Sequence, residues 1–225
     1  MVVEFVGPGA VGKSSIAQAL ARHLTRTGLE AWVEPTPVEG SAWNHVTRVD
    51  LLAALRYART LGLGWRDGMA RECIDLAVAQ AALRQFRRLN GVVLSQGVSR
   101  DLWISGRRHE ATDVTRIRAI GHLKLPDAVV LVTSSTLNRK TRSKTRTKPP
   151  NSNGHSKKEL YRMLLPEKIK TVSMSESMTN LGRALRHHQV PTLDLLNDGS
   201  LDEGAAEVFH FLATVRELRL GAATP

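Results

Sequence analysis

Short apolar runs alternate with longer segments of mixed polarity along the whole chain. Runs short and apolar enough to form strands occur at 2–6, 31–33, 92–94, 128–132 and 192–195. Between these runs, apolar side chains recur every three or four residues, as they do in helices that pack one face on a core. This alternation predicts an α/β fold in which a parallel sheet is covered by helices on both faces.

Helix start and stop signals divide the segments between the runs. A helix is expected at 42–61, where Gly62 ends the apolar periodicity, and another at 67–89, directly before the third strand. Ser200 and Glu203 have the spacing of a capping box, so the last helix is expected to begin there. With 42% apolar residues and no composition break, the chain is expected to form one domain, 1–225.

Residues 7–14 read G-P-G-A-V-G-K-S, which matches the phosphate-loop pattern G-x-x-x-x-G-K-S. The motif lies between the first predicted strand and a segment with Ile16, Leu20 and Leu24 at helical spacing, where such a loop belongs. Glycines let backbone N–H groups turn toward phosphate oxygens, and the following helix directs its positive end at the same place. The pattern predicts a binding site for a nucleoside triphosphate.

Two side chains at the end of the motif complete the predicted site. Lys13 would neutralise the β- and γ-phosphate oxygens, and Ser14 would offer its hydroxyl to a magnesium ion that bridges them. The residues expected to contact the nucleotide are Gly7, Gly9, Ala10, Val11, Gly12, Lys13, Ser14 and Ser15.

The positive charge of the chain is concentrated in one segment. The formal net charge is +11, and eight Lys/Arg residues with no Asp/Glu occur between 139 and 158. Residues 143–156 lack hydrophobic periodicity and include Pro149-Pro150, which predicts a mobile loop. A basic lid at about 134–158 is therefore expected over the triphosphate.

Composition also narrows the class of protein. No stretch of about 18 apolar residues occurs, and the N-terminus lacks the basic and apolar regions of a secretion signal. We expect a soluble protein of the cytoplasm, or of the host cytoplasm if a phage encodes it, with no membrane partner. Cys73 is the only cysteine, which excludes an internal disulfide, and its apolar neighbours predict a packing role.

Ligands of open parallel sheets bind beyond the carboxyl ends of the strands, so residues that follow the apolar runs are functional candidates. Glu34 follows the second run and would accept a proton from an acceptor hydroxyl or orient the hydrated magnesium. A solvated turn acid before Pro35 is the alternative. Arg139, Arg142 and Arg146 follow the fourth run, where they would stabilise charge during phosphoryl transfer. A solvated basic face and contacts with nucleic acid are the alternatives.

Two other side chains have two interpretations each. Gln80 lies on the apolar face of the helix expected at 67–89, and its amide needs a partner, either a nucleobase edge or a backbone carbonyl. Trp43, with Asn44 beside it, would either stack on a base in the acceptor pocket or pack in the core. The residues alone leave both questions open.

In the order of these features the chain resembles the deoxynucleoside kinase and thymidylate kinase family. The resemblance rests on the phosphate loop, Glu34-Pro35, Trp43-Asn44, the helical segment 79–83, and the arginines that follow 125–131. It covers most of the chain thinly, and only the phosphate loop is highly specific. It implies a five-stranded parallel sheet, ATP and magnesium as cofactors, and transfer of the γ-phosphate to a hydroxyl or phosphate of a (deoxy)nucleoside or nucleoside monophosphate.

Residue by residue, the resemblance implies roles for three side chains. Glu34 becomes the candidate base, Gln80 the amide that recognises the nucleobase, and Asp101 the acid that follows the third strand. By analogy with the family, a homodimer is also expected.

One segment departs from the family pattern. The deoxynucleoside kinases have Glu-Arg-Ser after the third strand and the thymidylate kinases have Asp-Arg followed by Tyr or Phe, whereas this chain has Ser95-Gln96-Gly97. The arginine of that pattern lies near the 5′ group of the acceptor. Arg100, three residues further on, is the candidate replacement.

The leading hypothesis is an ATP-dependent kinase of free nucleosides or nucleotides. The alternative is a phage-type DNA kinase that phosphorylates a hydroxymethyl-pyrimidine within DNA, with residues 139–158 binding nucleic-acid phosphates. The missing arginine and the charge of the lid favour this alternative. A GTPase-like switch is disfavoured because 138–141 lacks the aspartate of a guanine-binding motif, and an ATP-binding protein without catalysis stays open.

Overall fold

The structure, a computed structural model, describes residues 1–33, 44–64, 69–109, 112–135, 138 and 174–221. This part of the chain contains a sheet in the order β2-β3-β1-β4-β5, in which all neighbouring strands are parallel. The strands are β1 (Val2–Val6), β2 (Ala31–Val33), β3 (Val92–Ser95), β4 (Ala128–Thr133) and β5 (Thr192–Leu196). The predicted α/β fold is confirmed, and every strand begins at the residue predicted.

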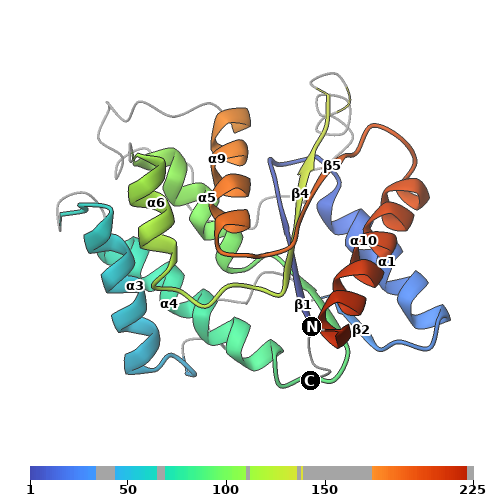
Figure 1. Ribbon diagram of the computed structural model, residues 1–225, viewed down its shortest axis with the longest axis horizontal. Coiled ribbons are helices and arrows are strands. Elements are labelled where there is room, and N and C mark those ends of the chain that lie inside the picture. The colour runs from blue at the N-terminus through green and yellow to red at the C-terminus, as the bar shows by residue number, and fades with distance from the viewer. Residues whose placement is uncertain (34–43, 65–68, 110–111, 136–137, 139–173, 222–225) are drawn as a thin grey trace, which may run out of the picture.

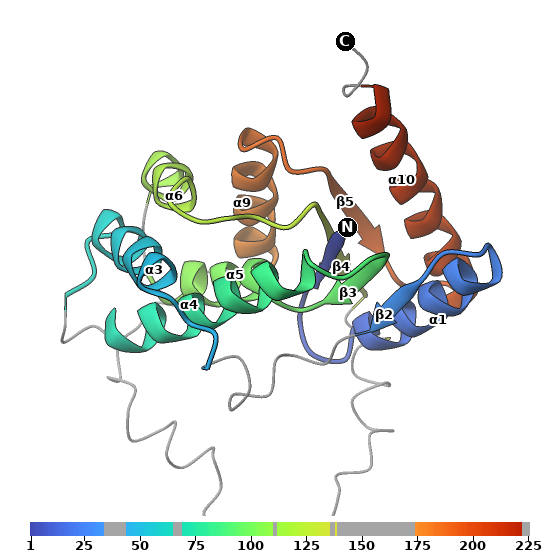
Figure 2. The same cartoon turned by 90° about the horizontal axis from the view of Figure 1, so that it is seen from below.

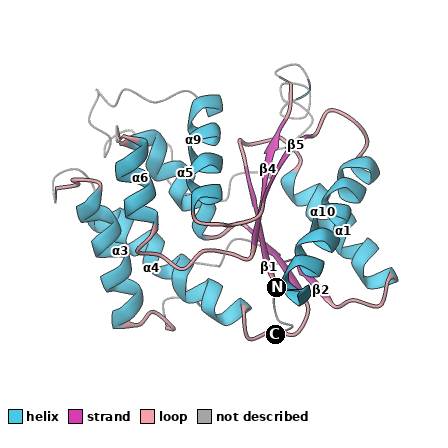
Figure 3. Ribbon diagram, in the orientation of Figure 1, coloured by secondary structure: helices cyan, strands magenta, loops and turns pink. Residues whose placement is uncertain are grey.

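Helices cover both faces of this sheet. They are α1 (Lys13–Arg26), α3 (Arg48–Thr60), α4 (Met69–Phe86), α5 (Val98–Arg108), α6 (Asp113–Ile120), α9 (Met174–His187) and α10 (Leu201–Gly221). Helices α1 and α10 lie together on one side, and the other helices form a layer on the opposite side (Figures 1 and 2). Figure 3 shows the strands between these two helical layers.

The central strand β1 supplies side chains to two separate cores. Val3 and Phe5 pack in the core with α1 and α10, whereas Val2 and Val6 pack in the core of the other layer. Because both faces are buried in β1, β3 and β4, these strands are almost continuously apolar rather than alternating. Glu4 is the polar exception in β1, and the strand's alternation places it on the face of Val2 and Val6.

The position of β1 also fixes the place of the predicted phosphate loop. β1 pairs with β3 on one side and with β4 on the other, so the strand order reverses at β1. Ligands of such sheets bind at this reversal, beyond the carboxyl ends of the strands. The segment that joins β1 to α1 contains residues 7–12, so the fold places the predicted loop at the expected ligand position.

Among the helix starts predicted from the sequence, the one at residue 42 was wrong. The helix expected from residue 42 begins at Arg48, and residues 44–47 are not helical. Its start is set by Thr47, whose N–H donates to Asp50 Oδ2 at 2.8 Å and whose Oγ1 accepts the Asp50 N–H at 3.4 Å. The capping box predicted at Ser200 and Glu203 is confirmed, with hydrogen bonds of 2.8 and 3.1 Å.

Three further observations concern the described residues as a whole. No helix among them is both long and apolar enough to cross a membrane. No group of three or more His, Cys, Asp and Glu side chains within the same ranges is placed to hold a metal ion. Cys73, in α4, is half-buried and packs against core residues that include Ala58 of α3. Burial raises the pKa of its thiol.

Candidate functional site

The loop between β1 and α1 leads into the open N-terminus of a helix. Ala10 and Gly12 adopt positive φ values of 65° and 91°, and Gly12 stands directly before α1. The Gly12 carbonyl accepts the N–H of Ile16 at 2.9 Å, which starts the helix. The first turn has no acidic residue, and no side chain caps Gly12. The positive end of the helix is therefore not offset by a carboxylate of its own first turn.

Gly7 allows this loop to pass close to the neighbouring strand. A Cβ atom at Gly7 would overlap with the backbone carbonyl of Val132 in β4, and the residue has a φ of 156°. Gly9 differs, because a Cβ atom there would meet no atom within 4 Å. Close packing thus requires glycine at position 7, while the backbone at position 9 is open to its surroundings.

Lys13 bends back across the loop that precedes it. Its Nζ donates to the carbonyl of Gly7 at 2.8 Å and to the carbonyl of Pro8 at 2.7 Å. Ser14 and Ser15 are exposed in the first turn of α1. An ammonium group, a helix N-terminus and two accessible hydroxyls are thus gathered at one loop, which suits a polyphosphate and its metal ion.

The turn after β5 is hydrogen-bonded to the phosphate loop. Asn197 is 2% exposed, and its Nδ2 donates to the carbonyl of Val11 at 2.6 Å. Its own backbone N–H donates to the carbonyl of Thr133 at 2.8 Å, at the end of β4. No sequence motif singles out Asn197, although the rule that selects strand ends applies equally to the fifth strand.

The next residue of this turn binds the chain that leaves β4. Asp198 Oδ1 accepts the backbone N–H of Ser135 at 2.8 Å and the side-chain amide of Asn138 at 3.1 Å. Two consecutive residues after β5 therefore hold two different segments, the phosphate loop and the residues that follow β4.

The side chain of Glu4, in β1, caps the N-terminus of α5, which follows the neighbouring strand β3. It is 1% exposed, and its carboxylate accepts the N–H groups of Val98 at 3.0 Å and Ser99 at 2.6 Å. Burial raises the pKa of Glu4, although these hydrogen bonds oppose the shift. A Cβ atom at Gly97 would overlap with the Glu4 carboxylate. This contact gives a physical reason for glycine at the end of Ser95-Gln96-Gly97.

Arg100 and Asp101 lie together in the first turn of α5, and both side chains are half-buried. Burial raises the pKa of Asp101 to about 8, against an ordinary value near 3.8. The carboxylates of Asp75, Glu4 and Glu72 raise it further, and the Arg100 guanidinium opposes them. The two residues are consecutive in sequence, and the structure places both in the helix that follows the carboxyl end of β3.

The side-chain amide of Gln80 binds the backbone of Lys124. Its Nε2 donates to the carbonyl of Lys124 at 2.8 Å, and its Oε1 accepts the Lys124 N–H at 2.9 Å. Lys124 lies just before β4, at the amino ends of the strands, whereas the phosphate loop lies at their carboxyl ends. Both ends of the amide are bound by backbone, which is the second of the two partners considered for Gln80 and favours a structural role over contact with a nucleobase.

Several predicted site residues lie outside the described residues. These are Glu34, Trp43, Arg139, Arg142 and Arg146, together with the rest of the basic segment 139–158. Asn44, the neighbour of Trp43, is described and is exposed. The roles predicted for these side chains stay predictions.

A buried ion cluster joins α4 to the end of α5. Glu72 accepts from Arg108 Nη1 at 2.7 Å, and His109 Nε2 lies 3.6 Å from the same carboxylate oxygen. Burial opposes ionisation of Glu72, but the nearby His109 imidazole and the hydrogen bond from Arg108 together hold its pKa below the usual value. The cluster fixes the two helices to each other at a buried polar contact.

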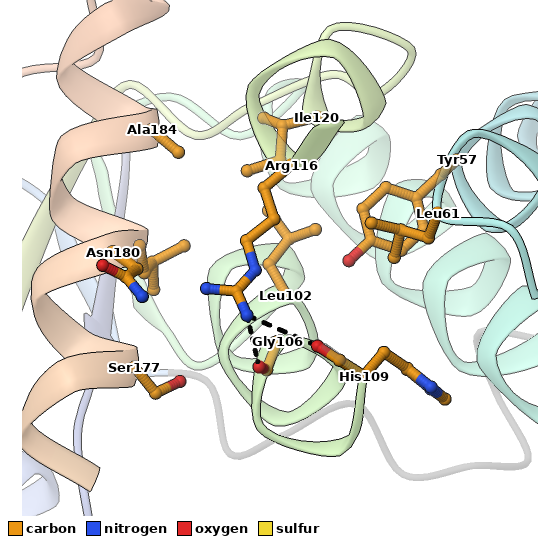
Figure 4. Close-up of a pocket in the computed structure, with 11 residues that line it drawn as sticks. Tyr57, Leu61, Leu102, Gly106, His109, Arg116, Ile120, Ser177, Asn180 and Ala184 are labelled. Atoms are coloured by element: carbon orange, nitrogen blue, oxygen red, sulfur yellow. Dashed lines mark hydrogen bonds between the residues drawn. The ribbon is translucent and has the colours of Figure 1, made fainter. Parts of the chain in front are cut away.

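A small cavity lies between α3, α5, α6 and α9 (Figure 4). The Arg116 side chain crosses it and donates to the carbonyls of Gly106 and His109 at 3.1 and 3.3 Å. On the opposite wall, Tyr57 donates its hydroxyl to Ser105 at 3.1 Å, and burial raises the pKa of this phenol. The cavity volume is about 20 Å³, which holds a water molecule but not a nucleoside.

These observations define the class of the fold. It is an α/β fold with the G-x-x-x-x-G-K-S segment after the central strand of a parallel sheet, at the point where the strand order reverses. No protein-family model matches the sequence, and no curated protein matches it. Among solved structures, the chain is similar to a deoxyadenosine kinase from M. mycoides with bound dATP, with a TM-score of 0.45 and 15% identity over 95% of this chain and 100% of that chain. This likeness concerns the course of the chain alone.

Proposed function

We propose that the protein is an ATP-dependent phosphotransferase that transfers the γ-phosphate of Mg-ATP to a hydroxyl or phosphate of a nucleoside or nucleotide. The proposal is carried by the geometry of residues 7–14, where Lys13 bends over the loop and the N-terminus of α1 lacks a side-chain cap. This loop stands where ligands of open parallel sheets bind. Backbone N–H groups, a lysine and a helix end together match the charge of a triphosphate.

The residues of the loop have separate tasks in this proposal. Lys13 Nζ would exchange the carbonyls of Gly7 and Pro8 for oxygens of the β- and γ-phosphates, which are stronger acceptors because they are charged. The exposed hydroxyl of Ser14 would bind the magnesium ion, whose charge would stabilise the transferring phosphoryl group. The loop would thus position ATP, the phosphate donor, and other residues would bind the acceptor.

For the acceptor, the described part of the chain offers Arg100 and Asp101. Arg100 would supply the positive charge that a phosphate or 5′ group near the reacting atoms requires. Asp101, with a pKa raised to about 8 by burial, would carry a proton at neutral pH and would donate a hydrogen bond. Their place beyond β3 supports this assignment.

The remaining roles rest on the sequence. Glu34 follows β2, and we propose that it accepts the acceptor's proton or orients the hydrated magnesium. Trp43 is proposed to stack on the acceptor base, and Arg139 and Arg142 to stabilise charge on the triphosphate.

The second candidate is a kinase that acts on hydroxymethyl-pyrimidines within DNA. Eight basic and no acidic residues between 139 and 158 favour it, because polymer phosphates bind such charge strongly. The segment Ser95-Gln96-Gly97 also favours it, since the arginine expected near a free 5′ group is absent.

One transfer assay separates these candidates. Purified protein with magnesium and γ-labelled ATP is offered free nucleosides, nucleoside monophosphates, and DNA with ordinary or hydroxymethylated pyrimidines. Label on a small molecule supports the first candidate, and label retained on DNA supports the second. The Lys13→Ala protein is the control, because label transfer that survives this change does not depend on the phosphate loop. No transfer to any acceptor, with ATP still bound, would contradict both candidates.

A further inference from the structure

We propose that Asn197 is a positioning residue of the phosphate loop, which turns the Gly12 N–H toward the bound triphosphate by holding the Val11 carbonyl. The inference rests on the nucleotide binding proposed above. It gives a role in that binding to a residue 186 positions away from the loop in sequence.

The hydrogen bond between Asn197 and the loop is buried and short. Nδ2 of Asn197 lies 2.6 Å from the Val11 carbonyl oxygen, and Asn197 and Val11 are 2% and 1% exposed. Water does not compete with a hydrogen bond at such a place, and an unpaired carbonyl there would be costly. The side chain therefore specifies the orientation of the carbonyl.

The orientation of the Val11 carbonyl determines that of the next N–H group. The peptide unit is planar and trans, so the carbonyl of Val11 and the N–H of Gly12 point in opposite directions. Asn197 holds the carbonyl on the side of β5 and α10, because it follows β5 directly and precedes α10. The Gly12 N–H consequently points away from that side, toward the concave side of the loop that Lys13 crosses.

Gly12 needs such an external constraint. It has a φ of 91°, and glycine rotates more freely about its backbone bonds than any other residue. The carbonyl of Gly12 accepts the N–H of Ile16 at 2.9 Å, so the peptide unit between Gly12 and Lys13 is fixed by α1. The peptide unit between Val11 and Gly12 is fixed by Asn197. The anchor is itself held in place, because the Asn197 N–H donates to the Thr133 carbonyl at 2.8 Å.

The test uses a variant of similar shape that cannot donate. Asn197→Leu keeps the branched side chain and removes the hydrogen bond to Val11. Tyr57→Phe is the matched control, because it also removes one buried hydrogen bond, 3.1 Å in length, but between helices of the other layer. Two quantities are measured for each protein: ATP affinity by calorimetry, and the backbone amide resonances of its glycines after selective labelling with ¹⁵N.

The inference predicts a specific pair of changes in Asn197→Leu. ATP affinity falls by about three- to tenfold, as expected for one lost hydrogen bond of typical net strength. Without nucleotide, the Gly12 amide resonance moves while that of Gly28, which stands in open space at the end of α1, does not. Tyr57→Phe lowers the melting temperature but leaves both ATP affinity and the Gly12 resonance unchanged.

The other outcomes each overturn a stated claim. Unchanged ATP affinity in Asn197→Leu, an unmoved Gly12 resonance, or an equal loss of affinity in Tyr57→Phe would overturn the inference alone. A wild-type protein that does not bind ATP would overturn the proposed function and the inference with it. If Asn197→Leu does not fold, Asn197→Ser is measured in the same way, and failure of both to fold would make Asn197 a structural residue and overturn the inference.

Discussion

The carboxylate of Glu4 occupies the space that a side chain at Gly97 would need. Glu4 lies in β1, and Gly97 follows the neighbouring strand β3, directly before α5. The N–H groups at the start of α5 are therefore bound by an acid from an adjacent strand instead of by a capping residue of their own. The unusual segment at 95–97 is thus explained in part by packing, independently of any acceptor.

Gly97→Ala should destabilise the protein. The added methyl group would overlap with the buried Glu4 carboxylate, and overpacking of this kind typically costs about 1–3 kcal/mol in unfolding free energy. Gly106→Ala is the control in the same helix, because its nearest neighbour would be Ser177 Oγ at 3.9 Å. Urea titrations of the two variants check this, and equal stabilities would refute the packing argument.

Asp101→Asn should change how stability depends on pH. The folded pKa of about 8 exceeds the ordinary value near 3.8, so the folded state binds the proton more tightly than the unfolded state. Wild-type stability from this group is full below pH ~4 and is lost as pH rises toward 8. The variant lacks this loss, so its melting temperature should rise relative to wild type between pH 5 and pH 8. Parallel curves over this range would show that Asp101 is not buried in this way.

Lys13→Ala should separate nucleotide binding from folding. The Lys13 ammonium donates to two carbonyls of its own loop, and its side chain is only half-buried, so unfolding free energy should change by less than about 1 kcal/mol. ATP affinity should fall by about tenfold or more, because charge-assisted hydrogen bonds to phosphate are lost. Calorimetry with ATP and a thermal melt test both statements. Retained affinity would contradict the proposed site.

Gln80→Leu should affect stability and leave acceptor kinetics unchanged. The change leaves the N–H and carbonyl of Lys124 without their partner, at a cost of about 1–3 kcal/mol. The KM for the acceptor should stay at the wild-type value, because the amide is bound by backbone away from the loop. A raised KM with normal stability would support the base-reading role.

Glu34→Gln should lower turnover while ATP affinity stays nearly the same. The carboxylate is proposed to act on the acceptor or on the water of the magnesium ion, so its loss should reduce kcat more than binding. Single-turnover transfer and ATP calorimetry measure the two effects separately. An equal loss of ATP affinity would show that Glu34 contacts the nucleotide.

The sequence was sufficient for the sheet and for the place of the loop. Buried parallel strands have continuous apolar runs, so the starts of β1, β3 and β4 at Val2, Val92 and Ala128 could be read directly. The start of α3 was misplaced because the apolar spacing of Val46, Val49 and Leu52 does not mark where the helix begins, whereas the capping box of Thr47 and Asp50 does.

The partners of polar side chains were not predictable in the same way. Gln80 had two physically reasonable partners, and only the approach of Lys124 from 44 residues away decides between them. Asn197 and Glu4 act through residues distant in sequence, and neither belongs to a local motif. A pattern that is local in sequence identifies the phosphate loop, whereas the side chains that support it come from the assembled sheet.

The hydrogen bond from Asn197 to Val11 has a consequence for the order in which the protein matures. A ribosome adds Val11 first, and the amide that orients its carbonyl is added 186 residues later. Contacts of such sequence separation form late, because the intervening chain must first be ordered. We expect a nascent chain released before residue 197 to bind nucleotide poorly, because the Val11 carbonyl lacks the hydrogen bond from Asn197. Nucleotide binding would then begin only once the turn after β5 has been synthesised.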